Sequence, residues 1–273
     1  MRQLKILAAA SLILTAACRT TVYVPSPTNA PALKEKHEFK ATVGPNSIQT
    51  AFAITDHLAI MANGQYVYRS NLFSSDGQTQ SSNGYDRYVQ GGSGEAAIGY
   101  FLPIKDRGRK SAIFDVYAGY GTGGFNTLDR NYDKKYAANA NDYKIETRFS
   151  KFFIQPSIGI VHPVVETIFS SRISLVNFYG LHAGSRATPF DSTYSDKGSF
   201  YEIGARTRLL YEPAITVRLG YKYGKFQMQL QHSLSFSGDN DHNFTTYFEP
   251  LSFNVGATLD IAKWYHSKTK QLK

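Results

Sequence analysis

Hydrophobic and polar residues alternate with a period of two along most of the chain after residue 37. The alternation is clearest in residues 214–236, where aliphatic and aromatic side chains occupy nearly every second position between Thr, Gln, Ser and basic residues. A period of two places the two sets on opposite faces of a strand. No segment sustains the 3.6-residue period of an amphipathic helix. We therefore expect an all-β fold.

The lengths of the predicted strands and of their connections favour a transmembrane barrel over a soluble sandwich. Strands of about 9–11 residues are needed to cross a bilayer at a tilt, and most of the alternating segments reach that length. The connections alternate between short turns and long polar loops, the long ones being 70–86, 124–144, 183–199 and 237–249. Short turns at one end and long loops at the other are typical of outer-membrane barrels.

We expect an antiparallel up-and-down barrel of about ten strands, with eight or twelve as alternatives. The predicted strands are 37–43, 47–54, 58–69, 87–102, 111–123, 145–160, 166–182, 200–222, 226–236 and 250–262. The segment 200–222 is too long for one crossing, and dividing it near Pro213 would give eleven strands. We favour one long strand with a bulge at Pro213, because proline cannot donate to a ladder. The even count places both termini on the periplasmic side.

The N-terminus has the layout of a secretory signal. Residues 6–17 are apolar and uncharged, follow two basic residues, and are too few to span a bilayer. The small residues before Cys18, in Leu14-Thr15-Ala16-Ala17, resemble the bacterial lipoprotein processing box. This resemblance implies that residues 1–17 are removed and that Cys18 carries acyl chains such as palmitate. Three prolines in residues 18–36 then predict an extended, lipidated tether of polyproline II character.

Further segments resemble a group of Bacteroidota outer-membrane lipoproteins. The resemblance rests on Tyr23-Val24-Pro25, on residues 49–57 and on Met61-Ala62-Asn63-Gly64. It implies an outer-membrane location and a tether followed by a small barrel, here residues 37–264, with a basic tail at 265–273. The lack of acidic residues directly after the cysteine favours, by the same resemblance, an anchor that faces the periplasm. Asp191-Ser192-Thr193 resembles the O-glycosylation site of that phylum, with Ser192 as the acceptor.

Composition narrows the candidate chemistry. The formal net charge is +9, but the basic residues are spread over turns and the tail, which favours contact with anionic lipid or cell wall over nucleic acid. A single cysteine excludes an internal disulfide and a multi-cysteine zinc site. Asp239 and Asp241 resemble the opening of a calcium loop. Phe244 and Pro250 stand where such a loop needs Gly and Glu, so we expect no metal site.

Several polar residues share the parity of the inward face and are candidates for the barrel lumen. They are Glu95, Asp115, Arg218, Lys222, Gln227, Gln229, Gln231 and Asp260. Charges of both signs in a narrow barrel are expected to pair, because buried charges need partners. A ten-stranded barrel is only slightly wider than the eight-stranded barrels whose interiors side chains fill. We therefore expect a plugged lumen and no open pore.

The sequence carries no GxSxG motif and no spacing typical of a nucleophile with its base. We expect no catalytic residues and no cofactor apart from the covalent lipid on Cys18. The leading hypothesis is a non-enzymatic structural or accessory subunit of an envelope complex, with outer-membrane lipid and other outer-membrane or periplasmic proteins as partners. A small channel or ligand-binding barrel is the first alternative, and an outer-membrane enzyme acting on lipid is the second.

Overall fold

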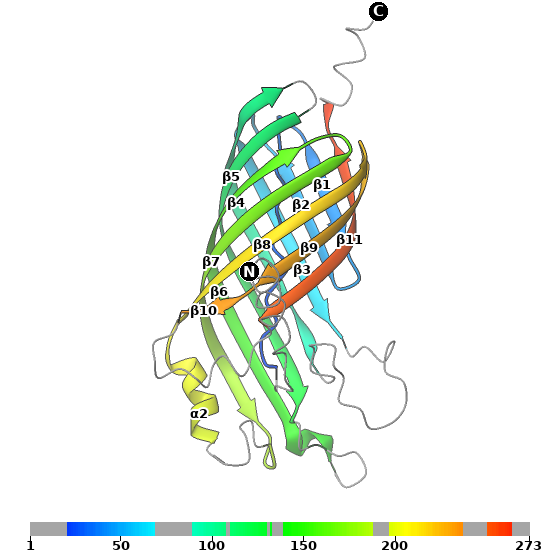
Figure 1. Ribbon diagram of the computed structural model, residues 1–273. Coiled ribbons are helices and arrows are strands. Elements are labelled where there is room, and N and C mark those ends of the chain that lie inside the picture. Colours follow the sequence, from blue (N-terminus) through cyan, green and yellow to red (C-terminus); the bar gives the residue numbers. More distant parts are fainter. Residues whose placement is uncertain are drawn as a thin grey trace, which may run out of the picture.

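The chain forms a closed antiparallel β-barrel of ten strands, as expected (Figure 1). The computed structural model describes residues 21–68, 89–107, 110–129, 132, 139–187, 197–236 and 250–263. The barrel strands are β1 (Phe39–Val43), β2 (Ser47–Ala53), β3 (Leu58–Val67), β4 (Gln90–Arg107), β5 (Lys110–Leu128), β6 (Lys144–Val161), β7 (Val165–Ala183), β8 (Arg208–Tyr221), β9 (Gly224–His232) and β11 (Leu251–Ile261). Each strand pairs with the next one along the chain, and pairing of β1 with β11 closes the cylinder.

Outside the ten barrel strands lie one short strand and three short helical segments. The strand β10 (Leu234–Ser235) pairs with β8. The helical segments are η1 (Ala140–Tyr143), α2 (Lys197–Glu202) and η2 (Ile203–Ala205). Within the described ranges, no helix has the length and apolar character needed to cross a membrane.

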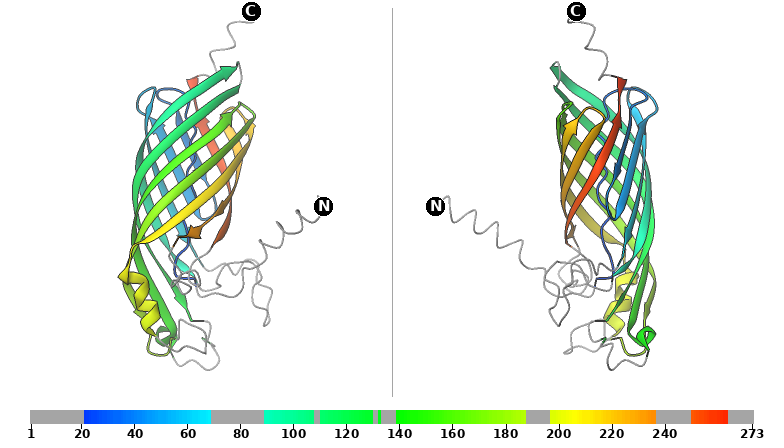
Figure 2. Two further views of the ribbon diagram at one scale, coloured as in Figure 1. Left: turned by 60° about the vertical axis from the view of Figure 1, so that its left-hand side comes forward. Right: turned by 90° about the vertical axis from the view of Figure 1, so that its right-hand side faces the viewer.

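The two ends of the barrel differ in their connections. At one end, which we call the turn end, short turns join β2 to β3, β4 to β5, β6 to β7 and β8 to β9. The opposite end, which we call the loop end, carries the longer connections predicted from the sequence, together with α2 and the projecting tips of β6 and β7 (Figures 1 and 2). Strands β5, β6 and β7 have 19, 18 and 19 residues, so the barrel wall is tall where these three strands lie next to one another.

Two details of the predicted strand 200–222 are wrong. Its first residues are helical, and β8 begins only at Arg208. The helical residues Phe200 and Ile203 pack into an apolar cluster at the loop end, and this tertiary contact overrides the strand pattern. The predicted bulge at Pro213 is also absent, since Pro213 pairs in register with Ser171. Proline removes one ladder hydrogen bond here, which does not require an extra residue.

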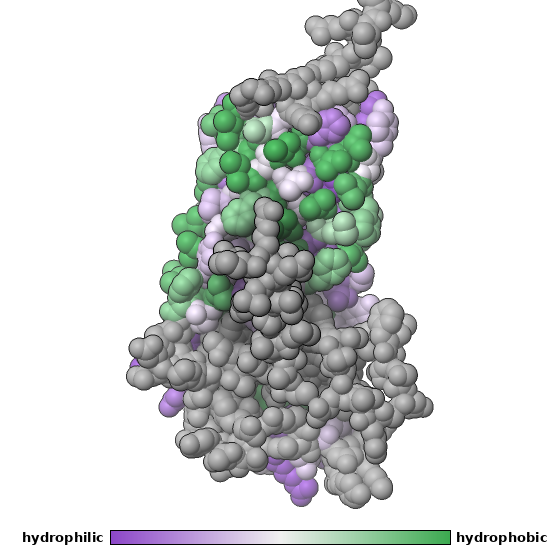
Figure 3. All heavy atoms as spheres, in the orientation of Figure 1, coloured by the Kyte–Doolittle hydropathy of each residue, from purple (hydrophilic) through white to green (hydrophobic). Residues whose placement is uncertain are grey.

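The outer face of the barrel is an apolar band. Its most exposed members include Ile60, Ile98, Phe152, Ile154, Ile158, Phe169, Ile173, Ile215, Leu230 and Phe253. Among the described side chains of the strands, the only outward charges are Lys144, Glu146 and Arg148, in the part of β6 that projects at the loop end. The outward run on β7 from Val165 to Leu175 corresponds to a height of about 25 Å for a strand tilted by about 45°. Figure 3 shows hydrophobic residues of this band on the upper part of one face of the molecule.

Glycines of β5 make room for large side chains inside the barrel. Gly119, Gly121 and Gly123 face inward and pair with the inward residues Phe153, Lys151 and Phe149 of β6. A Cβ atom on Gly119 would lie 2.5 Å from the Phe153 ring. The glycine-rich stretch therefore serves packing across the lumen, and it precedes no helix that could bind a phosphate at its N-terminus.

Candidate functional site: the occupied lumen

The N-terminal segment lies inside the barrel. Every residue from Thr21 to Leu33 is buried, and Figure 2 shows this dark-blue segment within the ring of strands. The extended tether predicted for residues 18–36 carried no indication that the barrel would surround residues 21–33. The segment is extended, as its prolines suggest, but the lumen surrounds it. We call residues 21–33 the plug.

The first residues of the plug are held by an aromatic cluster at the loop end. The Tyr23 ring lies nearly perpendicular to the rings of Phe125, Phe149 and Phe178, with centroid distances of 6.4, 4.8 and 5.5 Å. Val22 and Val24 belong to the same buried cluster. Edge-to-face ring pairs add to the free energy of simple burial, so this cluster fixes the plug at its entry.

The middle of the plug is bound through its backbone. Five successive carbonyl oxygens each accept a hydrogen bond from a wall side chain: Ser26 from Gln231 (3.2 Å), Pro27 from Gln49 (3.2 Å), Thr28 from Gln229 (2.6 Å), Asn29 from Gln155 (2.5 Å) and Ala30 from Arg218 (2.9 Å). The Thr28 amide and hydroxyl both donate to Gln231 Oε1, at 2.9 and 3.0 Å. An extended chain has no hydrogen bonds to itself, so these side chains satisfy backbone groups that burial would otherwise leave without partners.

A first group of charges lies beside the plug at mid-height. We call Glu95, Lys151 and Arg172 the central charge cluster. The Glu95 carboxylate lies 2.6 Å from Lys151 Nζ and 3.4 Å from Arg172, and all three side chains are at most 1% exposed. Arg172 also donates to Gln155 Oε1 at 2.9 Å, the same glutamine whose amide holds the plug. The central cluster thus positions one of the donors that bind the plug.

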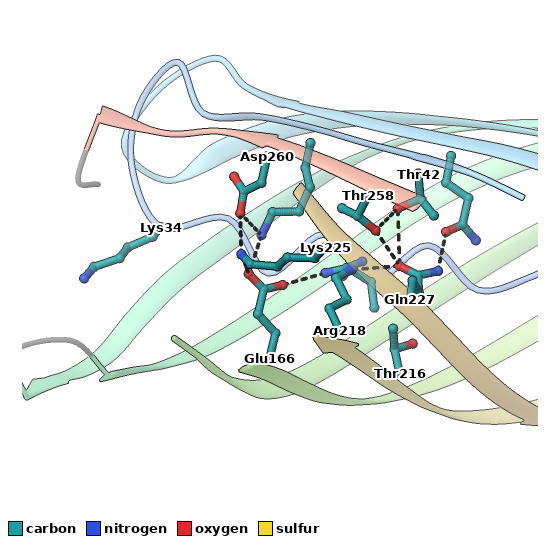
Figure 4. A network of polar contacts seen from close by, with 12 residues as sticks. Lys34, Thr42, Glu166, Thr216, Arg218, Lys225, Gln227, Thr258 and Asp260 are labelled. Carbon is teal, nitrogen blue, oxygen red and sulfur yellow. Dashed lines mark hydrogen bonds and ion pairs between the residues drawn. The ribbon is translucent and has the colours of Figure 1, made fainter. Parts of the chain in front are cut away.

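A second group of charges fills the turn end (Figure 4). We call it the basal charge cluster; its members are Glu38, Lys40, Glu166, Arg218, Lys225 and Asp260. Glu166 contacts Lys225 at 2.6 Å and Arg218 at 3.0 Å, and Lys40 at 3.5 Å. Three cations face three carboxyl groups, so each buried charge has an opposite partner, as burial requires. Arg218 links this cluster to the Ala30 carbonyl of the plug.

Glu38 closes the turn by which the chain leaves the lumen and enters β1. Its carboxyl group accepts hydrogen bonds from the amides of Lys34 at 2.7 Å and Glu35 at 3.2 Å. Burial raises the pKa of Glu38 to about 8, against the lowering effect of the nearby Lys40 ammonium. His37 has a φ of 65°, in the left-handed region that a sharp reversal requires. The turn therefore depends on both a side-chain clamp and an unusual backbone conformation.

The structure places most of the predicted lumen residues where the alternation puts them. The buried inward residues are Glu95, Asp115, Arg218, Gln227, Gln229, Gln231 and Asp260. Asp115 lies close to the Ala32 amide, so it too faces the plug. Lys222 was wrongly predicted: β8 ends at Tyr221, and Lys222 lies in the following turn with a φ of 46° and its Nζ over the Tyr221 ring. The alternation does not extend into that turn.

Several inward charges were missed, although they obey the same alternation. They are Lys40, Lys151, Glu166, Arg172, Glu212 and Lys225. Lys151 on β6 and Arg172 on β7 lie an even number of residues from other inward residues of the same strand. The alternation in the sequence could therefore have identified both. Cys18, Ser192, Asp239 and Asp241 lie outside the described residues.

The described residues of the lumen form no candidate metal site. The described residues contain no group of three or more His, Cys, Asp or Glu that could hold a metal ion. A shallow hollow lies on the outer wall, where Thr50, Ala62, Ala96 and Ala118 are small and Phe52 and Ile98 border them.

No protein-family model matches this chain, and no curated protein or solved structure is detectably similar to it.

Replacing Tyr23 tests how strongly the plug is held. Tyr23→Ala removes a ring packed among three phenylalanines and is expected to lower the free energy of unfolding by about 3–5 kcal/mol. Tyr23→Phe keeps the ring and removes a buried hydroxyl that has no hydrogen-bond partner among the described residues. The free energy of unfolding of the Phe variant should therefore lie within about 1 kcal/mol of that of the parent, or above it. Urea titration followed by tyrosine fluorescence and gel mobility measures both, and similar losses in the two variants would contradict the packing argument.

Replacing Glu166 tests the basal charge cluster. Glu166→Gln leaves Lys40, Arg218 and Lys225 with one carboxylate fewer in a buried site, which is expected to cost about 3–5 kcal/mol. Glu146→Gln is the matched control, because Glu146 is 41% exposed and its ion pair with Lys144 should contribute at most about 1 kcal/mol. The same urea titration compares the two variants. Equal stability of the two would show that the buried cluster contributes no more than a surface pair.

Proposed function

We propose that this chain is an outer-membrane β-barrel lipoprotein with a closed lumen, acting as a non-enzymatic structural or accessory subunit of an envelope complex. The observation that carries the proposal is the combination of an uncharged apolar outer band with a lumen filled by the chain's own N-terminal segment. The apolar band supports the membrane location, and the filled lumen supports a role at the surfaces of the barrel.

The distribution of polar residues supports a membrane location. A soluble barrel keeps charged side chains outside and apolar ones inside. Here eleven acidic or basic side chains among the described strand residues point inward, whereas isoleucine, leucine and phenylalanine point outward. The inward set is Lys40, Glu95, Asp115, Lys151, Glu166, Arg172, Arg208, Glu212, Arg218, Lys225 and Asp260. This inverted arrangement is stable where hydrocarbon surrounds the barrel. Tyr66 and Tyr179 near the loop end and Tyr100 and Tyr221 near the turn end are exposed, as in an interfacial aromatic girdle.

The filled lumen argues for a role at the surfaces of the barrel. Plug and charge clusters occupy the interior, which leaves no pathway for a diffusing solute and no accessible pair of catalytic groups among the described residues. What remains available is the outer wall and the projecting loop end, formed by the tips of β5 to β7 with α2 and η2. Surfaces of this kind suit contacts with lipid and with other envelope proteins.

A charge at mid-height of the outer wall tests the membrane location. Ile158 is 52% exposed on β6, and Ile158→Lys is expected to lower stability in lipid vesicles by about 2–4 kcal/mol. Ser150→Lys lies on the same strand and face but near the loop end, where the cost should be at most about 1 kcal/mol. Folding in vesicles is measured by the shift in gel mobility between unheated and heated samples. No difference between the two positions would argue against a surrounding bilayer.

Conductance measurements distinguish the closed barrel from a channel. The full chain in a planar bilayer should show no conductance steps, because the plug fills the lumen. A variant that lacks residues 21–33 should show them, since it leaves a lumen lined by glutamines and charges. Steps from the full chain at the same size and frequency would support the channel alternative.

Co-purification tests the accessory role. The chain, tagged at its C-terminus and extracted from native membranes in mild detergent, should elute with one or more proteins in fixed stoichiometry. A tagged variant with Ile154→Lys and Ile158→Lys, which disrupts the outer band, should lose them. Elution of the parent as a single monodisperse monomer would contradict the subunit role while leaving the membrane location intact.

A further inference from the structure

The plug has a direction. Its start lies at the loop end, where Tyr23 packs against Phe149 and Phe178. Its last residue, Leu33, belongs to a cluster at the turn end with Ala53 and Phe101. A polyproline II chain of ten residues would span about 31 Å, close to the hydrocarbon core of about 30 Å. The plug spans somewhat less, because Ala32 has a φ of 46° and departs from this conformation. The plug therefore runs through the full height of the barrel.

The chain enters its first strand at the turn end. The His37 amide donates to the Ala53 carbonyl at 2.8 Å, and Phe39 pairs with both Phe52 and Ile261. Ten strands, an even number, then bring the chain back to the same end, where β11 finishes at Ile261. Thr21 and Ile261 thus lie at opposite ends of the barrel. An even number of strands alone would put both ends of the described chain on one side, but the plug adds one more passage through the barrel.

Resting on the proposed membrane location and lipidation, we infer that the chain crosses the membrane once more through its own lumen. Its N-terminus is thereby presented on the side of the long loops, opposite to its C-terminus. Only Arg19 and Thr20 lie between Cys18 and Thr21, and the three chain steps between these two residues can span at most about 11 Å, which is less than half of the hydrocarbon core. The acyl chains on Cys18 therefore insert into the leaflet at the loop end. Since long loops of outer-membrane barrels face outward, this is the outer leaflet.

The contacts of the plug make this passage specific. Its carbonyl groups are bound by β2, β6, β8 and β9, so donors converge on it from opposite sides of the lumen. Glu38 then fixes the reversal into β1. Withdrawing the plug would leave five wall donors and the Phe rings around Tyr23 without their partners in the plug. These contacts hold the plug in one place and in one direction within the barrel.

Antibody access to intact cells tests the inferred topology. One epitope is inserted between Thr20 and Thr21, a second in the loop at residues 70–86, and a third after Lys273, in three separate full-length chains. The first two epitopes should be bound on intact cells and the third only after permeabilisation. Binding of the first epitope only after permeabilisation, together with the third, would overturn the inference. Absence of all three chains from the outer-membrane fraction would instead refute the proposed location.

Cross-linking in the folded protein tests the threading itself. The Ser26 and Ser93 hydroxyl oxygens lie 3.1 Å apart, so Ser26→Cys with Ser93→Cys should be joined by a short thiol cross-linker. The matched control is Ser26→Cys with Ser157→Cys, because Ser157 lies nearer the turn end on β6. Cross-linking of the first pair only is the expected result. Equal yields for both pairs, or none for the first, would show that residue 26 does not occupy this place in the lumen.

Discussion

An extended polypeptide makes no hydrogen bonds to itself, so it can be buried only where its surroundings supply a partner for each backbone group. The plug meets this constraint in two ways. Pro25, Pro27 and Pro31 remove three amide donors, and five wall side chains donate to the carbonyl groups from Ser26 to Ala30. The glutamines that line the lumen are the counterpart of the plug, because a carboxamide can donate to one backbone group and accept from another.

The charge clusters follow from the same constraint. Cations that face the plug, such as Arg218, also need carboxylate partners in a lumen that excludes water. Glu166 supplies one to Arg218, Lys40 and Lys225. Glycines on β5 then make room for the large residues opposite them, including Lys151. Removing any one of these groups leaves another buried group without its partner, so plug, clusters and glycines depend on each other.

These features also explain why the barrel is a poor candidate for a pore and a better one for an anchor. The plug fills the interior of the barrel, while the described side chains of the outer band carry no charge over about the height of a bilayer. A lipid-bearing N-terminus that emerges beside the long loops would give the protein two attachments to the membrane. Both attachments would hold the projecting loop end close to the surface.

The sequence by itself determined the ten strands and the inward position of residues such as Glu95, Gln229 and Asp260, because side chains of a strand must alternate between two faces. The helical start of the segment 200–222 and the turn at Lys222 were missed, since local pattern says little about where a tertiary contact or a tight turn interrupts a strand. Only the tertiary structure decided what fills the lumen. A proline-rich extended segment has the same sequence pattern in solvent as in a barrel, and its place depends on partners from β2, β6, β8 and β9 that lie far away in the chain.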